Sequence, residues 1–419
     1  MNESRVIRRA DGMSVQFVDK KGFCGTYTAV SVEAGGNDRR IAAGGAVRPI
    51  LPGAAHFLEH LVFSGRDQAL GRALARRGIS ANAMTKHEET IYYASATGDA
   101  GYTVDVLLDA VAGISFSDED VQKEKAIILS EIDMLENDPS YALQEKLLRA
   151  MYPVHPVQDD IGGTQDDVRG LHTEALRAFH QTYYAGGRIR VTVAGDLSVS
   201  MQDAIAQRAF AAFPENRPDL VRPFVVDDAA LTGETLTVTA PVELPQFALG
   251  IKIDPALWPA DPAARYLKHI QLAFWLETYF GRISPEYDRL VMDDLIDDGF
   301  HYGLWQGSDF AALFFFGHSR QPEAAAARIG DRLEHLLSAS PSEDLFELIR
   351  KAALGELLRR HDSVKRIGAM AASMLRHGID VFSLPAQYAK IKLPTADALT
   401  RHIASPAYRQ TVILLPGSQ

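Results

Sequence analysis

The stretch Pro52-Gly-Ala-Ala-His-Phe-Leu-Glu-His-Leu-Val-Phe63 decides how the rest of this chain is interpreted. In a helix, His56 and His60 lie one turn apart and Glu59 lies between them in angle, so the three polar side chains share one face. Neutral imidazoles at this spacing are typical zinc ligands, and a neighbouring carboxylate can take a proton from zinc-bound water. The order His-x-x-Glu-His inverts the more familiar His-Glu-x-x-His, and such inverted sites are known.

A third ligand distinguishes a zinc site from an ordinary surface or core histidine pair, because hydrolytic zinc sites have three protein ligands and one open position. Residues 118–136 carry apolar side chains at helical spacing, which predicts a second helix. Glu131 lies mid-helix and 71 residues beyond His60, and Glu124 lies two turns earlier on the same face. Glu131 can be the third ligand, and Glu124 can hold a ligand histidine in the right tautomer. The alternative is that both are solvated helix carboxylates.

Several stretches in the first half of the chain resemble, in order, the pitrilysin family of inverzincin metallopeptidases. They are 54–65, 79–85, 90–94, 124–131, 155–157 and 161–164. The resemblance implies one zinc ion per chain, held by His56, His60 and Glu131, with Glu59 as the general base. It also implies that peptide substrates lie beside an edge strand that contains Asn82, Ala83 and Met84.

Composition agrees with a large globular enzyme. A chain of 419 residues with 47% hydrophobic content can form two or more domains. The net charge of -11 argues against a nucleic-acid partner, and Cys24, the only cysteine, excludes an intrachain disulfide. No run of eighteen apolar residues occurs and charges interrupt residues 1–19, so we expect a cytoplasmic protein without a membrane partner.

The order of predicted elements indicates an internal duplication. Three prolines and alternating charges in Pro214-Glu-Asn-Arg-Pro-Asp-Leu-Val-Arg-Pro223 predict a linker, so we divide the chain into a zinc-binding half at 1–213, a linker at 214–232 and a second half at 233–419. The second half repeats the strands, hairpin and helices of the first without the metal motif. We therefore predict an α+β fold of two homologous α/β-sandwich halves, each with an antiparallel-rich sheet covered by helices. The resemblance implies that such halves close like a clam shell.

One position departs from the family pattern. The resemblance implies an Arg and a Tyr seven residues apart, just before the hairpin of the second half, which polarise the scissile carbonyl and bind substrate. Tyr302 falls at the Tyr position, but Leu295 stands in place of the Arg. Loss of one such donor typically costs about a hundredfold or more in rate. Arg282 and Arg289 lie nearby, although their spacing differs from the family pattern.

These observations predict a zinc endopeptidase that hydrolyses unstructured peptides. The missing Arg, together with the resemblance to small bacterial members that work beside a sister subunit, predicts a heterodimer with a chain of the same fold that supplies Arg and Tyr. By analogy with such members, the substrate class is a ribosomal peptide precursor. Two alternatives stay open: a non-catalytic scaffold or core-type subunit of the same fold, and a zinc hydrolase of non-peptide substrates.

Overall fold

The computed structural model describes residues 4–43, 45–64, 69–98, 100–216, 222, 225, 227, 231, 233–336 and 342–417. They form two compact units. Unit 1 comprises Met1–Ile132, Asp159–Pro223 and Leu357–Leu384, and unit 2 comprises Asp133–Gln158, Phe224–Glu356 and Pro385–Gln419. Within the described residues, no helix is both long and apolar enough to cross a membrane.

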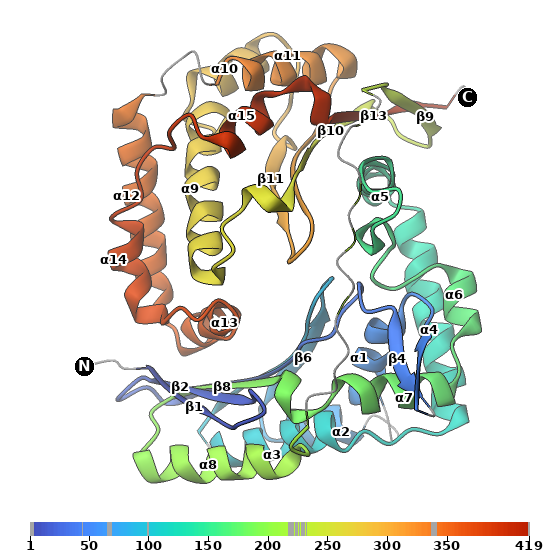
Figure 1. The fold of residues 1–419 in the computed structure, drawn as a ribbon, viewed down its shortest axis with the longest axis vertical. Helices are drawn as coiled ribbons and strands as arrows, with labels where there is room; N and C mark the ends of the chain where they lie inside the picture. The colour runs from blue at the N-terminus through green and yellow to red at the C-terminus, as the bar shows by residue number, and fades with distance from the viewer. Residues whose placement is uncertain are drawn as a thin grey trace. The chain divides into compact units, whose positions relative to one another are not determined.

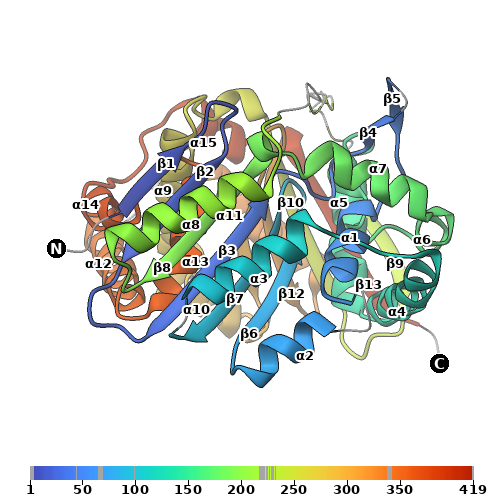
Figure 2. The same ribbon diagram turned by 90° about the horizontal axis from the view of Figure 1, so that it is seen from below.

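A six-stranded sheet forms the centre of unit 1 (Figures 1 and 2). Neighbouring strands pair antiparallel except β2 and β8, which are parallel. The strand β6 is at the edge of the sheet and pairs antiparallel with β7. The strands in spatial order are β1 (Ser4–Arg8), β2 (Ser14–Asp19), β8 (Ile189–Gly195), β3 (Gly25–Val32), β7 (Thr90–Thr97) and β6 (Ser80–Thr85).

Helices cover both faces of this sheet. Figures 1 and 2 show α3 and α8 on one face and α13 on the other. The helix α13 approaches closely at Gly368, where an added Cβ would lie 2.5 Å from the Tyr27 ring. The helices of unit 1 are α1 (Ala54–Ser64), α2 (Ala69–Arg76), α3 (Ala100–Ala112), α6 (Gln165–Gly170), α7 (Thr173–Tyr183), α8 (Val199–Ala212) and α13 (Val364–Leu375), and α4 (Asp118–Glu136) begins there. A small ribbon adds β4 (Arg40–Ala43) and β5 (Ala46–Pro49).

Unit 2 repeats this plan with five strands. All pairs are antiparallel except β13 with β9. In spatial order the strands are β11 (His301–Gln306), β12 (Ala311–His318), β10 (Gln246–Ile253), β13 (Arg409–Pro416) and β9 (Leu236–Ala240). The helices are α5 (Pro139–Met151), α9 (Pro262–Phe280), α10 (Pro285–Met292), α11 (Pro322–Glu334), α12 (Glu343–Arg360, which ends in unit 1), α14 (Leu384–Tyr388) and α15 (Ala398–Ala404).

Each half of the sequence supplies one helix to the sheet of the other half. The helix α5 lies before residue 213 in sequence but packs through Leu143, Leu147 and Met151 against β10, β12 and β13 in unit 2. The helix α13 belongs to the second half of the sequence but packs on β3 and β8 in unit 1. Sequence halves and compact units therefore do not coincide, because amphipathic helices pack wherever an apolar sheet face is uncovered.

The predicted α+β fold with two mixed helix-and-sheet halves is confirmed. The small elements β1, β4, β5, α6, α10, α14 and α15 were not predicted, because each is too short to show a clear period in sequence. Much of the predicted linker at 214–232 lies outside the described residues, so its boundaries stay a prediction.

Candidate metal centre

The helix α1 carries the His-x-x-Glu-His motif, as predicted. Its apolar side buries Phe57 and Leu58 completely in the core of unit 1. The chain enters the helix through Gly53, whose φ of 87° is unfavourable for residues other than glycine. An added Cβ on Gly53 would lie only 2.3 Å from the carbonyl oxygen of Gly162. The loop at 162–163 is thus packed against the first turn of the motif helix.

Three donor atoms converge above α1. The Nε2 atoms of His56 and His60 are 3.2 Å apart, and Glu131 Oε2 from α4 lies 3.4 Å from His60 Nε2 and 3.9 Å from His56 Nε2. With zinc–ligand bonds of about 2.0–2.2 Å, neighbouring ligand atoms of a tetrahedral site are about 3.3–3.6 Å apart. The three separations, 3.2, 3.4 and 3.9 Å, scatter around this spacing, and the donor set of two imidazoles and one carboxylate suits zinc chemically.

Glu124 lies behind this group rather than in it. Its carboxylate accepts a hydrogen bond from His60 Nδ1 at 2.8 Å, and its side chain is buried. An Nδ1–H donor leaves the lone pair of His60 on Nε2, which is the atom beside His56 and Glu131. Glu124 is therefore placed to orient His60 and to select its tautomer.

The surroundings of the two histidines shift their pKa values in opposite directions. Burial, with the neighbouring His60, lowers the pKa of His56 to about 4, so its ring is neutral at neutral pH. Burial also disfavours the charged form of His60, but the hydrogen bond to Glu124 and the nearby carboxylates outweigh it and raise the His60 pKa. A bound dication would oppose the rise in the His60 pKa, because an imidazole must be neutral to coordinate a metal ion.

Glu59 has surroundings different from those of the other carboxylates. Its Oε2 accepts a hydrogen bond of 2.5 Å from Thr85 Oγ1, at the end of β6. Burial raises the pKa of Glu59, although the bond from Thr85 opposes this shift. A carboxylate held beside the three donors with a raised pKa suits a general base. Sequence reasoning missed Thr85 as a positioning group, because its contact with Glu59 is not local.

The strand β6 brings the predicted substrate-binding residues to the sheet edge. Ala83 is buried and Met84 is exposed, as expected for alternating faces. The N–H of Ala83 donates to Asn82 Oδ1 at 2.8 Å, which suits an N–H that points away from β7. No strand among the described residues pairs with the free side of β6. That side can accept an added peptide strand.

The predicted residues of the second half are engaged inside unit 2. The Tyr302 hydroxyl donates to a Glu277 carboxylate, and burial and this carboxylate raise the Tyr302 pKa. Leu295 is buried in the apolar core of the unit. Arg282 donates to the Asp298 carbonyl at 3.2 Å, and Arg289 lies 3.4 Å from Glu286.

Comparison with known families agrees with this arrangement. Residues 48–165 match the family described as "Insulinase (Peptidase family M16)", and residues 171–353 match "Peptidase M16 inactive domain". The chain belongs to peptidase family M16. The predicted resemblance to pitrilysin-type enzymes is thereby confirmed, and the zinc motif falls inside the first match, not in the part described as inactive.

Several M16 proteins resemble this chain over most of its length or over part of it. The Bacillus subtilis protein "Uncharacterized zinc protease YmfH" is 27% identical over 364 residues, which cover 86% of this chain and 84% of the relative. A crystal structure of an M16-like peptidase from Alicyclobacillus acidocaldarius has a TM-score of 0.88 at 26% identity and covers 99% of both chains. The probable mitochondrial-processing peptidase subunit beta of Arabidopsis thaliana is 26% identical over 238 residues, 55% of this chain and 44% of that protein.

Proposed function

We propose that this M16 chain is a zinc endopeptidase that hydrolyses unstructured peptides. The convergence of His56, His60 and Glu131, with Glu59 held beside them by Thr85, is the observation that carries the proposal. The open edge of β6 supports a peptide as substrate, because an added strand is recognised through its backbone. The predicted cytoplasmic location is part of the same proposal.

In this function each residue has a separate task. His56, His60 and Glu131 would hold zinc, which supplies a Lewis acid that polarises the scissile carbonyl and acidifies water. Glu59 would take the proton of the attacking water and pass it to the leaving amine. Asn82, Ala83 and Met84 would align the substrate backbone, and Glu124 would keep Nε2 of His60 aimed at the metal.

The proposal includes a sister subunit. Leu295 is buried among apolar side chains and cannot donate a hydrogen bond to an oxyanion. A homodimer would carry the same leucine in every copy, so a second chain of the same fold with the Arg and Tyr is the simplest complement. Trimming of a ribosomal peptide precursor is the substrate class that we assign by analogy with small bacterial family members.

The decisive variant is Glu59→Gln. It should keep its zinc content and its thermal stability but lose turnover by about 10³-fold or more, because the base and the metal act as a unit. Turnover is measured on unstructured peptides in the presence of the sister subunit, and zinc is measured by elemental analysis of the same samples. Glu119→Gln, on the exposed first turn of α4, is the matched control and should be unchanged.

Two results would contradict the proposal. Nearly full activity in Glu59→Gln would require another base, and loss of zinc in that variant would make Glu59 a ligand. A wild-type complex that binds zinc and peptides without cleaving them would instead support the scaffold alternative.

A further inference from the structure

The turn that follows the proposed substrate strand is tied to a second loop. Residues Lys86–Glu89 join β6 to β7, and the loop after β3 lies against them. The N–H groups of Gly36 and Asn37 donate to the carbonyls of Lys86 and His87 at 2.8 and 2.7 Å. An added Cβ on Gly35 would lie 2.2 Å from the Lys86 carbonyl oxygen. The position of the turn is thus coupled to this loop.

Three buried carboxylates lie at the same place. Asp38, Glu88 and Glu89 are each exposed by 5% or less. Isolated carboxylates at such depth are strongly destabilising, so they require paired cations. Burial raises the pKa of Asp38 against the opposing effect of Arg222, whereas Arg376 and Lys86 outweigh burial and lower the pKa of Glu89.

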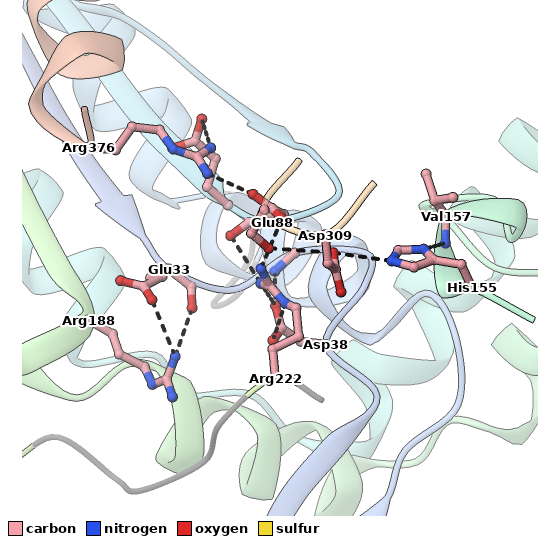
Figure 3. A network of polar contacts seen from close by, with 12 residues as sticks. Glu33, Asp38, Glu88, His155, Val157, Arg188, Arg222, Asp309 and Arg376 are labelled. Atoms are coloured by element: carbon pink, nitrogen blue, oxygen red, sulfur yellow. Dashed lines mark hydrogen bonds and ion pairs between the residues drawn. The ribbon is translucent and has the colours of Figure 1, made fainter. Parts of the chain in front are cut away.

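Two arginines provide most of the pairing, and we call them the arginine clamp (Figure 3). Arg222 lies 2.7 Å from Asp38 and 3.4 Å from Glu88, and Arg376 lies 2.7 Å from Glu88 and 3.6 Å from Glu89. Figure 3 shows Glu88 between the two guanidinium groups. The two cations therefore share one buried carboxylate.

Neither arginine comes from the first 213 residues of the chain. Arg222 follows the first half of the sequence, and Arg376 is the C-cap residue of α13. Both nevertheless belong to unit 1, in which α13 packs on β3 and β8. Burial opposes the charge of Arg376, but Glu89 and Glu88 outweigh it and raise the Arg376 pKa, so the side chain stays a cation.

A short path connects the clamp with the proposed base. Thr85 is the last residue of β6 and is followed directly by the turn, and Thr85 pairs with Thr90 across the hairpin. The Thr85 hydroxyl donates to Glu59. We propose that Arg222 and Arg376 are positioning residues, which hold the Lys86–Glu89 turn so that Thr85 keeps Glu59 oriented. This inference rests on the proposed peptidase function for its catalytic consequence, but not for the clamp itself.

The first test of the arginine clamp does not depend on a measurement of peptidase activity. Removal of one cation leaves buried Glu88 underpaired, so the turn should open more often. In the full chain, Arg376→Gln should speed amide hydrogen exchange across residues 80–90 by about tenfold or more. Arg9→Gln is the matched control: Arg9 forms a 2.7 Å pair with half-buried Asp11 in the same unit, and its loss should leave exchange in 80–90 unchanged. Equal exchange in 80–90 for wild type and Arg376→Gln would overturn the clamp.

A milder substitution keeps the test informative if Arg376→Gln does not fold. Arg376→Lys keeps the charge but cannot contact Glu88 and Glu89 together through a planar group. It should give exchange rates between those of wild type and Arg376→Gln. If Arg376→Gln does not fold and Arg376→Lys exchanges like wild type, the clamp is overturned.

The catalytic consequence is tested by kinetics. Arg376→Gln should lower kcat by about tenfold to a hundredfold, with a smaller change in KM and unchanged zinc content. Thr85→Val should lower kcat similarly, and the two changes should not add in the double variant, because both act through one hydrogen bond to Glu59. Additive losses would overturn the path through Thr85. If Arg376→Gln speeds exchange as expected but the wild-type complex with the sister subunit cleaves no peptide, the proposed function is refuted and the clamp stays intact.

Discussion

Two glutamates near the same histidine illustrate how the immediate surroundings assign a role. Glu124 is buried and accepts a hydrogen bond from His60 Nδ1, so we assign it to the orientation of the ring. Glu59 accepts from Thr85 and is not bonded to the histidine Nε2 atoms, so its carboxylate can exchange a proton with water. The proposed mechanism therefore gives two glutamates two different tasks, and their hydrogen-bond partners are the basis for this assignment.

The first prediction at this scale concerns metal affinity. The wild-type chain should bind about one zinc ion, and Glu131→Gln or His56→Ala should abolish tight binding, because each removes one of three ligands. Glu124→Gln should weaken binding by only about 10–100-fold, since it removes the group that orients a ligand. Titration with a competing chelator measures both effects, and Glu119→Gln on the same helix as Glu124 serves as control. Equal affinity in all of these variants would exclude the assigned ligand set.

At the scale of elements, the motif helix depends on how the chain enters it. Gly53 combines a positive φ with close packing against the Gly162 carbonyl. The next residue, Gly163, also has a positive φ of 76°. The loop around Gly162 also approaches His56, the proposed zinc ligand, because an added Cβ on Gly162 would lie 3.3 Å from His56 Nδ1. The packing of the backbone at the start of α1 is thus linked to the position of the His56 ring.

We therefore expect Gly53→Ala to be strongly destabilising. Its positive φ should cost about 1–3 kcal/mol, and the clash with a backbone oxygen should add about 1–3 kcal/mol. Gly78→Ala is the matched control, since Gly78 has a φ of 68° but no neighbour within 4 Å of an added Cβ. Urea unfolding of both variants separates the two contributions. If Gly53→Ala lowers the free energy of unfolding no more than Gly78→Ala does, the loop at 162–163 moves aside without a cost in stability.

At the scale of the whole molecule, the two units contribute unequal chemistry. Unit 1 holds the candidate metal site and the open strand edge, whereas the described part of unit 2 holds Tyr302 bonded to Glu277 and a buried leucine at position 295. Among the described residues, the repeated fold of unit 2 carries no second candidate metal site. This asymmetry is the physical reason to expect a second chain.

The corresponding prediction is that the isolated chain hydrolyses peptides weakly. Addition of a sister subunit that carries the Arg and Tyr should raise kcat/KM by about a hundredfold, the typical contribution of one oxyanion donor. Tyr302→Phe tests whether this chain supplies a donor of its own, and Tyr266→Phe, which loses a hydroxyl bonded to Tyr388 in the same unit, is the control. Full turnover by the isolated chain, undiminished in Tyr302→Phe, would contradict a shared site and direct attention to Arg282 or Arg289.

The sequence by itself determined the features that depend on local periodicity. His56, Glu59 and His60 lie on one face because a helix repeats every 3.6 residues, and the apolar spacing around Glu131 indicates a helix for the same reason. The two-halved α+β fold follows from the repeated order of elements. The assignment of Glu131 as the ligand and of residues 82–84 as an edge strand depended on resemblance to the pitrilysin family, since periodicity does not measure distances between segments.

Only the tertiary structure decided which distant groups meet. It brought Glu131 Oε2 to within 3.4 Å of His60 Nε2, gave Glu59 its partner Thr85, and placed α5 and α13 on the sheets of the opposite halves. Arg376 contacts Glu88 although 288 residues separate them. Such contacts arise when apolar faces pack and buried carboxylates must be paired, and both requirements are met by the folded chain as a whole rather than by any segment of it.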